Sequence, residues 1–401
     1  MPLVNGRYAV VDLASGDVSE QSLPEDYALS GPKVLDRIDD ILRGRDDAIA
    51  IGSGVLTASF IPAACAGFLR RLGDSPSAER ICPLTGNIGV EMKLSGFDFI
   101  VLENAAEEPG YLWVRDGIAE FVPSPGMSER DSWGRTDAVR SEQGDRRIQV
   151  ISTGPWADEA LPTSQLVMNY WGGEDKNGFA AEFGRRNLLA AAFRGMGELE
   201  LDDPEGHFAS SNELQKAHIS LLGRSSGLAA FSEAASGDAL VQLRHRDVAC
   251  FGCPFPCRTF YKTAEDPKTM KLENKEPGYL AYDIPAVERM TALGLSSRDL
   301  ISVMTKCARH GAEPVSVVDS VASRGSGVDV ATVESLLESR GPVSAVGRTL
   351  PGAFSASFAD PESFVHCLSL GLCPRYWARV GFDLGPLSVA VERALGAACQ
   401  L

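Results

Sequence analysis

Basic residues are scarce in this sequence of 401 residues, which contains 38 lysine and arginine residues against 54 aspartate and glutamate residues. The net charge of −16 argues against nucleic acid or an anionic membrane as the main partner, because either would favour a basic surface. The sequence has no internal repeat and no low-complexity tract, and 44% of its residues are hydrophobic. This composition is typical of a globular protein with two or three domains.

Features of a secreted or membrane protein are also missing. Residues 1–7 do not combine a charged start with an apolar core, so we expect no signal peptide and a cytoplasmic location. Residues 48–69 are the longest stretch poor in charge, but they contain Pro62, three glycines and several hydroxyl side chains. This stretch therefore favours buried strand and loop over a membrane span.

The pattern of apolar residues changes near the middle of the chain. Before the acidic, proline- and glycine-containing stretch 202–206, apolar runs around Asp-Gly at 116–117 and Ser-Gly-Asp at 15–17 predict β-hairpins. After it, apolar residues recur three and four positions apart, as in helices. We therefore expect an α+β protein, with a β-rich N-terminal domain over residues 1–205 and a mainly α-helical region over residues 206–401.

The elements expected from these patterns can be stated by residue range. The strands are expected at 8–12, 18–23, 48–51, 97–103, 111–115, 118–122, 148–153 and 188–193. The helices are expected at 210–222, 282–293, 297–310, 330–339 and 387–398.

Nine cysteines without a secretion signal do not indicate a disulfide framework, because the cytosol keeps thiols reduced. Cys65, Cys82, Cys307 and Cys399 stand alone among apolar or small residues. A lone cysteine in such surroundings is usually a small hydrophobic residue. We interpret these four as packing residues and turn to the other five.

Three cysteines, Cys250, Cys253 and Cys257, form a CxxCxxxC motif on a segment bent by glycine and proline. Such a loop can turn all three sulfurs toward one metal centre. Zinc would need a second ligand pair, and the sequence has no second CxxC and no HxxxH. A [4Fe-4S] cluster needs one more cysteine. The motif favours the cluster, with zinc and a purely structural or reactive-thiol role as alternatives.

The fourth ligand is expected later in the chain. Cys373 follows a glycine-containing turn and precedes a proline, whereas Cys367 lies in what looks like the end of a helix. A turn lets a sulfur approach a cluster, so Cys373 is favoured over Cys367. A third alternative is that one iron stays open for chemistry, in which case Cys373 is not a ligand.

Six short segments carry a resemblance to a known family. They are 8–16 (YAVVDLASG), 83–89 (PLTGNIG), 94–98 (LSGFD), 153–155 (TGP), 184–188 (GRRNL) and 370–373 (LGLC). With the cysteine motif, their order resembles that in the aldehyde ferredoxin oxidoreductase family, the tungsten- or molybdenum-pterin enzymes that include the tungsten subunit of a benzoyl-CoA reductase. Only the cysteine motif is specific by itself.

This resemblance implies a first domain of two β-sheets that forms a base beneath a pterin cofactor, followed by helical domains. It also implies a [4Fe-4S] cluster that relays electrons between the pterin and ferredoxin, with the cysteine of the late LGLC segment, Cys373, as fourth ligand. A homodimer is a further implication.

Several departures concern the pterin. The family's glycine-rich loop after PLTGTIG is absent, since Gly89 runs directly into Val90. The GRGGxGAVMG stretch becomes 178–184, the arginine of SGRYS is replaced in the neighbourhood of Cys65, and the DTIS segment reads 313–316 without its aspartate. PAYDPRG is missing, and the helical part is shorter than in full-length members. Because these loops supply glycine for close approach and arginine for charge, we expect a chain without the usual tungstopterin.

Two further residues are candidates for chemistry. Glu276 lies near the position of the family's GPEYE glutamate, where a carboxylate in an apolar pocket serves as acid or base. A solvated loop glutamate beside Lys275 is the alternative. Arg258 directly follows Cys257 and is expected to stabilise the anionic cluster or to contact an acidic substrate; a plain surface role is the alternative.

Three functions remain open from the sequence. The first is an oxidoreductase that exchanges electrons with ferredoxin and acts on a small organic substrate. The second is a cluster-based enzyme that transfers sulfur or activates a substrate in the biosynthesis of a sulfur-containing metabolite. The third is a non-catalytic electron-relay subunit of a complex.

Overall fold

The computed structural model describes residues 3–45, 47–71, 80–173, 175–223, 226–263, 278–325, 327–341, 343, 358 and 360–397. The strands are β1 Arg7–Asp12, β2 Val18–Ser22, β3 Ile49–Ser53, β4 Gly67–Arg71, β5 Ile81–Leu84, β6 Phe99–Glu103, β7 Gly110–Arg115, β8 Ile118–Pro123, β9 Gln149–Ser152, β10 Val167–Met168, β11 Trp171–Gly172, β12 Leu188–Arg194, β13 Arg244–Val248, β14 Arg258–Lys262 and β15 Gly278–Ala281. The α-helices are α1 Val34–Ile41, α2 Ile88–Leu94, α3 Ser132–Glu142, α4 Pro155–Asp158, α5 Phe179–Arg185, α6 Pro204–Leu222, α7 Asp238–Leu243, α8 Ile284–Ala292, α9 Ser297–His310, α10 Pro314–Ser323, α11 Val330–Ser339, α13 Pro361–Ser369, α14 Pro374–Val380 and α15 Leu384–Leu395. Short 3-10 turns lie at Tyr27–Lys33, Pro125–Met127, Leu228–Ala230 and Ala234–Ser236.

Two six-stranded sheets make up the first half of the protein, as expected from the resemblance. Their strand orders are β2-β1-β6-β3-β4-β5 and β11-β10-β9-β12-β7-β8, and a third sheet has the order β13-β14-β15. The turn between β7 and β8 has positive φ at both Asp116 and Gly117, which is the backbone that a tight Asp-Gly hairpin requires. Both predicted hairpins are therefore confirmed.

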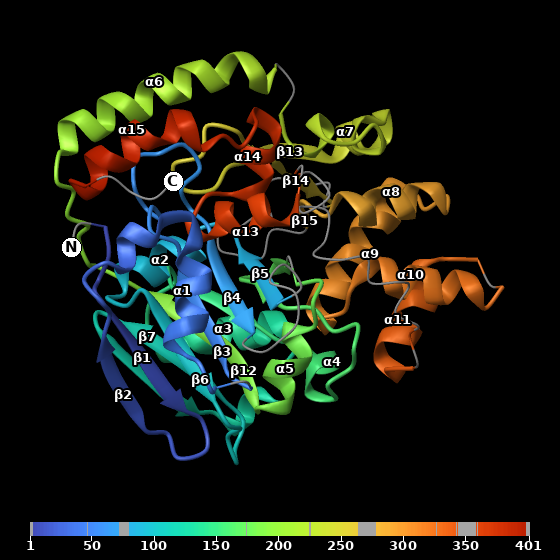
Figure 1. Ribbon diagram of the computed structural model, residues 1–401. Helices are drawn as coiled ribbons and strands as arrows, with labels where there is room; N and C mark the ends of the chain where they lie inside the picture. Colours follow the sequence, from blue (N-terminus) through green and yellow to red (C-terminus); the bar gives the residue numbers. More distant parts are fainter. Residues whose placement is uncertain are drawn as a thin grey trace.

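Strands β1, β3, β4, β5 and β6 of the first sheet are mostly buried, with successive side chains pointing to opposite covered sides, whereas the edge strand β2 is exposed. In β1, Ala9 and Val11 pack against the second sheet, in a core that also contains Leu112 of β7. Tyr8 and Val10 point the other way, into a second core. Figure 1 shows the sheets together at the lower left, with α13, α14 and α15 above them.

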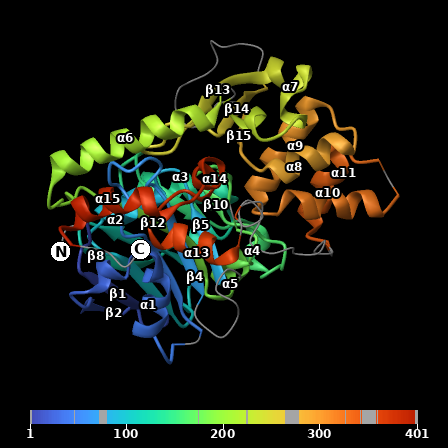
Figure 2. The ribbon, with the colours of Figure 1, turned by 45° about the horizontal axis from the view of Figure 1, so that its top comes forward.

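The second core joins parts that lie far apart in the sequence. It combines the outer face of the first sheet with α13, α14 and α15, and it also contains Cys65, Cys250, Cys257, Cys367 and Cys373. Helices α6 and α15 lie side by side across the top of the molecule (Figures 1 and 2). The cysteines are therefore built into the core that unites the beginning and the end of the chain.

The predicted helices are confirmed with small shifts in their ends. Helices α9 and α11 coincide with the expected ranges, while α15 spans Leu384–Leu395 because Asp383 caps its start and Gly396, with φ of 66°, ends it. Helix α6 starts at Pro204, within the stretch expected as a linker, because the Asp203 carboxylate accepts a hydrogen bond from the Gly206 N–H. The division of the chain at residue 205 stays a prediction.

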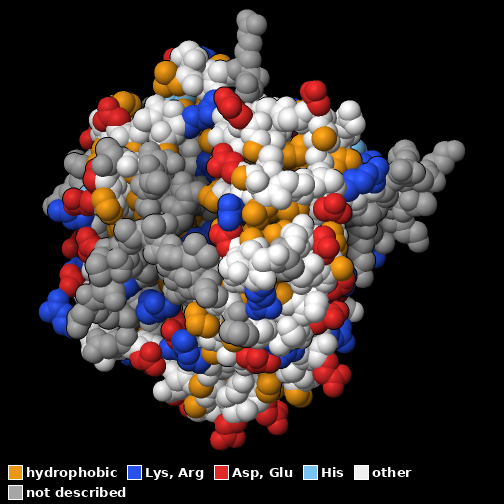
Figure 3. Space-filling model, turned by 90° about the vertical axis from the view of Figure 1, so that its right-hand side faces the viewer, with side chains coloured by type: hydrophobic (Ala, Val, Ile, Leu, Met, Phe, Trp, Pro, Cys, Tyr) orange, Lys and Arg blue, Asp and Glu red, His pale blue; other side chains and the backbone are white. Residues whose placement is uncertain are grey.

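The first half is less purely β-structured than its sequence suggested. Helices α1 to α5 alternate with its strands. Strand β4 begins in the apolar stretch 48–69, whose strand content was expected only in general terms, and strand β5 lies beyond this stretch, where no strand was expected. None of the described helices combines the length and apolar character needed to cross a membrane. Figure 3, a view of the side at the right of Figure 1, shows acidic and basic side chains scattered among each other.

A fully buried ion pair anchors α2 to the first sheet. Lys93 and Asp98 have no solvent exposure, and Lys93 Nζ donates to Asp98 Oδ1 over 2.9 Å. Asp98 Oδ2 also accepts from the Gly6 N–H, at 2.9 Å. We predict that Asp98→Ala lowers the free energy of unfolding by about 3–5 kcal/mol, because it leaves an unpaired buried ammonium. Urea unfolding followed by circular dichroism measures the change.

The matched control is Asp40→Ala, which removes an exposed ion pair with Arg43. Its effect is expected to stay within about 0.5 kcal/mol, since exposed pairs contribute little. Equal losses in the two variants would contradict the role assigned to Asp98.

Candidate metal centre

The CxxCxxxC motif forms the loop of a β-hairpin. Strands β13 and β14 pair up to Val248 and Arg258, so residues 249–257 close the turn between them. Gly252 has φ of 59°, in the left-handed region that glycine adopts without strain. The Cys253 N–H donates to the Cys250 carbonyl over 3.2 Å. The three cysteines thus lie on a tightly bent loop, as the sequence predicts.

Cys373 lies on a second turn, between α13 and α14. Gly371 reverses the chain with φ of 78°, and the Leu372 N–H donates to the Cys367 carbonyl. Cys373 then caps α14, whose first residue is Pro374. Cys367 lies inside α13, fully buried, with its Sγ donating to the Leu372 carbonyl at 3.4 Å. Cys373 therefore lies in a turn and Cys367 in a helix, as was assumed when Cys373 was favoured as the fourth ligand.

A third loop, residues 54–66 between β3 and β4, joins these two. Its backbone bonds to the α13–α14 turn through Val55 N–H to Ser369 O, Leu56 N–H to Leu370 O, Ala66 N–H to Gly371 O and Cys373 N–H to Ala63 O, at 2.9–3.1 Å. The Ala63 N–H also donates to the Gly252 carbonyl, at 3.1 Å. Loop 54–66 therefore holds both cysteine-bearing turns in place.

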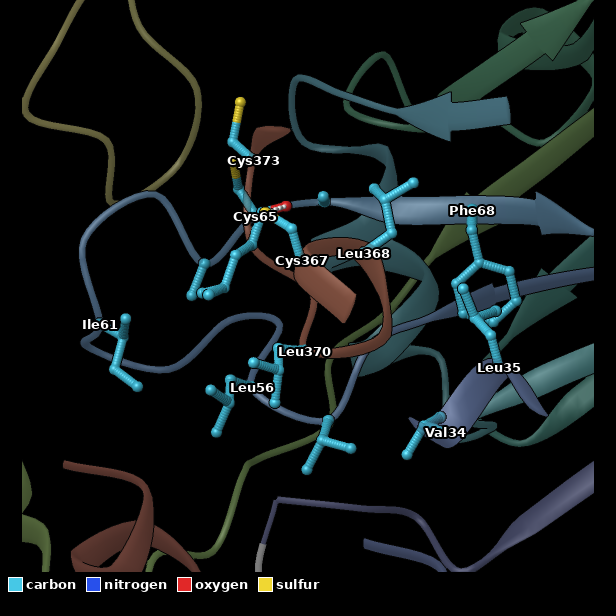
Figure 4. Close-up of a cluster of buried hydrophobic side chains, with 14 of the residues drawn as sticks. Val34, Leu35, Leu56, Ile61, Cys65, Phe68, Cys367, Leu368, Leu370 and Cys373 are labelled. Atoms are coloured by element: carbon cyan, nitrogen blue, oxygen red, sulfur yellow. Dashed lines mark hydrogen bonds between the residues drawn. The ribbon is translucent and has the colours of Figure 1, made fainter. Parts of the chain in front are cut away.

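Cys65 lies at the centre of this arrangement. Its side chain is fully buried in the same core as Cys250 and Cys373, and its single S–H is shared between these two sulfurs. Figure 4 shows Cys65, Cys367 and Cys373 grouped above the apolar side chains of Leu56 and Leu370. Cys65 is buried in the core, as expected of a packing residue, but it is not isolated, because it lies beside two other thiols. Its contacts are made by long-range folding, and the sequence around it carries no sign of them.

The thiols fall into two groups, one with a lowered pKa and one with a raised pKa. Donation from Cys65 lowers the pKa of Cys250 to about 5 and also lowers the pKa of Cys373, in spite of their burial. The same bonds raise the pKa of Cys65. Burial raises the pKa of Cys253 well above its usual value and that of Cys257 to about 12. Metal binding would have to displace protons from the last two.

Two arginines bring positive charge to the thiols. Arg258 Nη2 donates to Cys250 Sγ at 3.0 Å, and its Nη1 lies against the turn at Gly86, whose N–H also bonds Cys250. Burial alone would lower the pKa of Arg258, but attraction to the thiolate of Cys250, with a smaller contribution from Cys257, outweighs it and holds that pKa above its usual value. Arg375, the second residue of α14, has 7% exposure and also acts on Cys257.

The structure thus brings most of the predicted site residues together. Cys250, Cys253, Cys257 and Cys373 are electrostatic neighbours of one another. The sequence analysis missed Cys65 and Arg375, of which only Arg375 had a signal, as the second residue after Cys373. Glu276 lies outside the described residues. In the described part of the chain, no group of three or more His, Cys, Asp or Glu side chains is arranged around a single ion.

Comparison with known proteins gives a consistent picture for the first half. Residues 8–195 match the family described as aldehyde ferredoxin oxidoreductase, N-terminal domain. The tungsten-containing aldehyde ferredoxin oxidoreductase of Pyrococcus furiosus is 25% identical over 224 residues, which cover 50% of this chain and 35% of that protein. The enzyme of the same name from Pyrococcus abyssi is 25% identical over 215 residues, 49% of this chain and 34% of that protein. The match thus spans about a third of these relatives.

One solved structure shares the fold over nearly the whole chain. It is the active site complex BamBC of benzoyl coenzyme A reductase in complex with 1,5-dienoyl-CoA, with a TM-score of 0.66. The sequences are 15% identical, and the likeness covers 97% of this chain and 65% of that chain. The likeness of fold therefore extends to the helical second half.

The two candidates for the fourth ligand can be separated by substitution. We predict that Cys373→Ala lowers the iron content of anaerobically purified protein and weakens its visible absorption, because the cluster loses a ligand. Cys367→Ala, its neighbour in the same core, is the control and is expected to keep its iron. Iron loss in Cys367→Ala alone would reverse the assignment, and an intact cluster in Cys373→Ala would indicate an open iron.

The cysteine hairpin itself gives a second prediction. Cys253→Ala should abolish the iron–sulfur absorption and lower solubility, because the exposed loop loses the centre that organises it. Iron content and the ultraviolet–visible spectrum measure the effect. Normal iron content in this variant would contradict a metal centre on the hairpin.

Proposed function

Because residues 8–195 match the N-terminal domain of aldehyde ferredoxin oxidoreductase, we propose that this chain is an iron–sulfur oxidoreductase of that family. In this proposal, Cys250, Cys253, Cys257 and Cys373 hold a [4Fe-4S] cluster. The protein exchanges electrons with a ferredoxin-like carrier and acts on a small organic substrate without the usual tungstopterin. The convergence of four cysteine side chains from two distant turns, beside two arginines, is the observation that carries this proposal.

The donor set suits an iron–sulfur cluster. Such clusters are held by cysteine thiolates, and their potential depends on net charge and on hydrogen bonds to the sulfurs. When bound, the cluster supplies one-electron transfer. Arg258 and Arg375 compensate part of the negative charge of the thiolates, and Arg258 also fixes the position of Cys250 through its 3.0 Å hydrogen bond. The Nε of Arg258 is buried and makes no hydrogen bond to any described residue, which leaves one donor for a further acceptor.

The surroundings of the hairpin suit an electron carrier. Phe251, at the tip of the loop between two proposed ligands, is 45% exposed, so a docked protein comes close to the cluster without entering the core. Arg244, His245 and Arg246 of the adjoining strand β13 are exposed as well. An acidic carrier such as a ferredoxin is attracted to this strand by charge.

The packing of α2 supports the proposed loss of tungstopterin. Gly89 opens this helix where family members continue with a glycine-rich loop, and a Cβ added at Gly89 would lie 2.4 Å from the Gly67 nitrogen of β4. Glycine at this position therefore serves close contact between helix and strand. Because this segment is a helix packed on a strand, its N–H groups are not free to surround a cofactor.

Metal analysis tests the proposal directly. Anaerobically purified protein is expected to contain about four irons per chain, as one [4Fe-4S] cluster requires, and neither tungsten nor molybdenum. Inductively coupled plasma mass spectrometry measures all three metals together with zinc. Stoichiometric zinc in place of iron would overturn the cluster, and stoichiometric tungsten would overturn the loss of the pterin.

Arg258→Gln tests the role of the guanidinium. Removing a positive charge beside Cys250 disfavours the reduced, more negative cluster, so the midpoint potential should move to a more negative value while iron content stays near that of the wild type. Redox titration followed by electron paramagnetic resonance measures the shift. Arg115→Gln, at an exposed hairpin position, is the control for charge alone. The same potential in both variants would exclude a direct effect of Arg258.

A further inference from the structure

The loop that carries Cys65 is held in an unusual backbone conformation. Ala58 and Ala63 both have positive φ, at 71° and 58°, a region that costs a residue other than glycine about 1 kcal/mol or more. Backbone hydrogen bonds to both cysteine-bearing turns fix the loop in this shape. The Trp377 Nε1–H adds a further bond, to the Pro62 carbonyl at 3.1 Å. The backbone of the loop is therefore fixed, and this fixes the positions of its side chains.

What the loop presents there is a fifth thiol. Cys65 shares a buried core with Cys250, from the hairpin, and Cys373, from the α13–α14 turn, and its neighbours in the loop bond the backbone of both segments, so it lies between the segments that supply the ligands. It is fully buried, and the Thr57 hydroxyl donates to the carbonyl of the next residue, Ala66, at 2.7 Å. Packing alone does not require a thiol at a position beside two other thiols.

We propose that Cys65 is a positioning residue of the iron–sulfur site, which shares its single S–H between the ligand sulfurs of Cys250 and Cys373 and thereby sets the reduction potential of the cluster. The inference rests on the proposed function, because it presupposes a bound cluster. A [4Fe-4S] cluster has one ligand position per iron, and the hairpin and Cys373 fill all four. Cys65 therefore has no iron left to bind.

The physical effect follows from charge. Reduction adds an electron to a group surrounded by thiolates, and a hydrogen bond to a ligand sulfur takes up part of this added negative charge. The single proton of Cys65 is shared between two ligand sulfurs, one from each segment. Cys65 therefore favours the reduced state and also keeps the hairpin at a fixed distance from the α13–α14 turn.

The experiment compares Cys65→Ala with Cys65→Ser. Alanine removes the donor, and serine keeps one, since its hydroxyl also donates. Cys65→Ala is expected to retain the iron content of the wild type and to have a more negative midpoint potential. The expected change is at most tenfold in the ratio of oxidised to reduced cluster, about 59 mV for a one-electron couple. Cys65→Ser is expected to lie between Cys65→Ala and the wild type.

A spectroscopic readout separates this role from packing. Electron–nuclear double resonance of the reduced protein in H₂O and D₂O detects exchangeable protons near the cluster, and one such coupling should disappear in Cys65→Ala. Cys307→Ala is the matched control: Cys307 is equally buried, in α9, where Asp283 and Glu313 act on it electrostatically. Its potential and proton couplings should equal those of the wild type.

Three results would overturn the inference. Iron loss in both Cys65 variants, with iron retained in Cys373→Ala, would make Cys65 a ligand. An unchanged potential and unchanged proton couplings in Cys65→Ala would reduce Cys65 to packing. A shift of equal size in Cys307→Ala would assign the effect to general loss of stability. Absence of iron from the wild type is a different outcome, because it overturns the proposed function itself.

Discussion

The backbone hydrogen bonds of loop 54–66 are the constraint on which the rest of the site depends. They join a loop of the first sheet to the α13–α14 turn and to Gly252 of the cysteine hairpin, three segments separated by up to about 300 positions in the chain. Amide groups buried in this way must be paired, since an unmade bond costs about 1–3 kcal/mol. The meeting of Cys250 with Cys373 is thus a consequence of main-chain pairing. The side chains determine only the chemistry of the site where the two turns come together.

Charge is the second constraint, and it explains why the arginines lie where they do. Several thiols buried together cannot all ionise without positive charge nearby, as the raised pKa of Cys253 shows. Arg258 is supplied by the strand that continues the hairpin, and Arg375 by the helix that Cys373 caps. Each ligand-bearing segment thus brings its own cation. The site gains charge compensation from the same local structure that positions its sulfurs.

Sequence reasoning succeeded where the relevant interactions are local. The hairpin at Asp116-Gly117, helices α9 and α11, and the contrast between Cys373 and Cys367 all depend on turn, cap and periodicity signals within a few residues. It did not find the contacts of Cys65, because these arise only when distant segments pair through backbone atoms, which leave no mark on residue identity. Arg375 was overlooked although it lies two residues after Cys373. The start of α6 and both ends of α15 were displaced, because aspartate caps at the two starts and Gly396 at the end of α15 outweighed the apolar pattern. Glu276 stays a prediction from the resemblance.

The close packing of α2 against β4 also bears on the position of Cys65. A Cβ at Gly89 would meet the Ala66 carbonyl carbon at 2.6 Å, so α2 rests directly on the residue that follows Cys65. Helix α2 presses on this strand, and the loop before the strand lies in the core that contains Cys250 and Cys373. Cys65 is thereby held near the proposed ligand sulfurs. The close packing of α2 and the position of Cys65 in the core are therefore physically coupled.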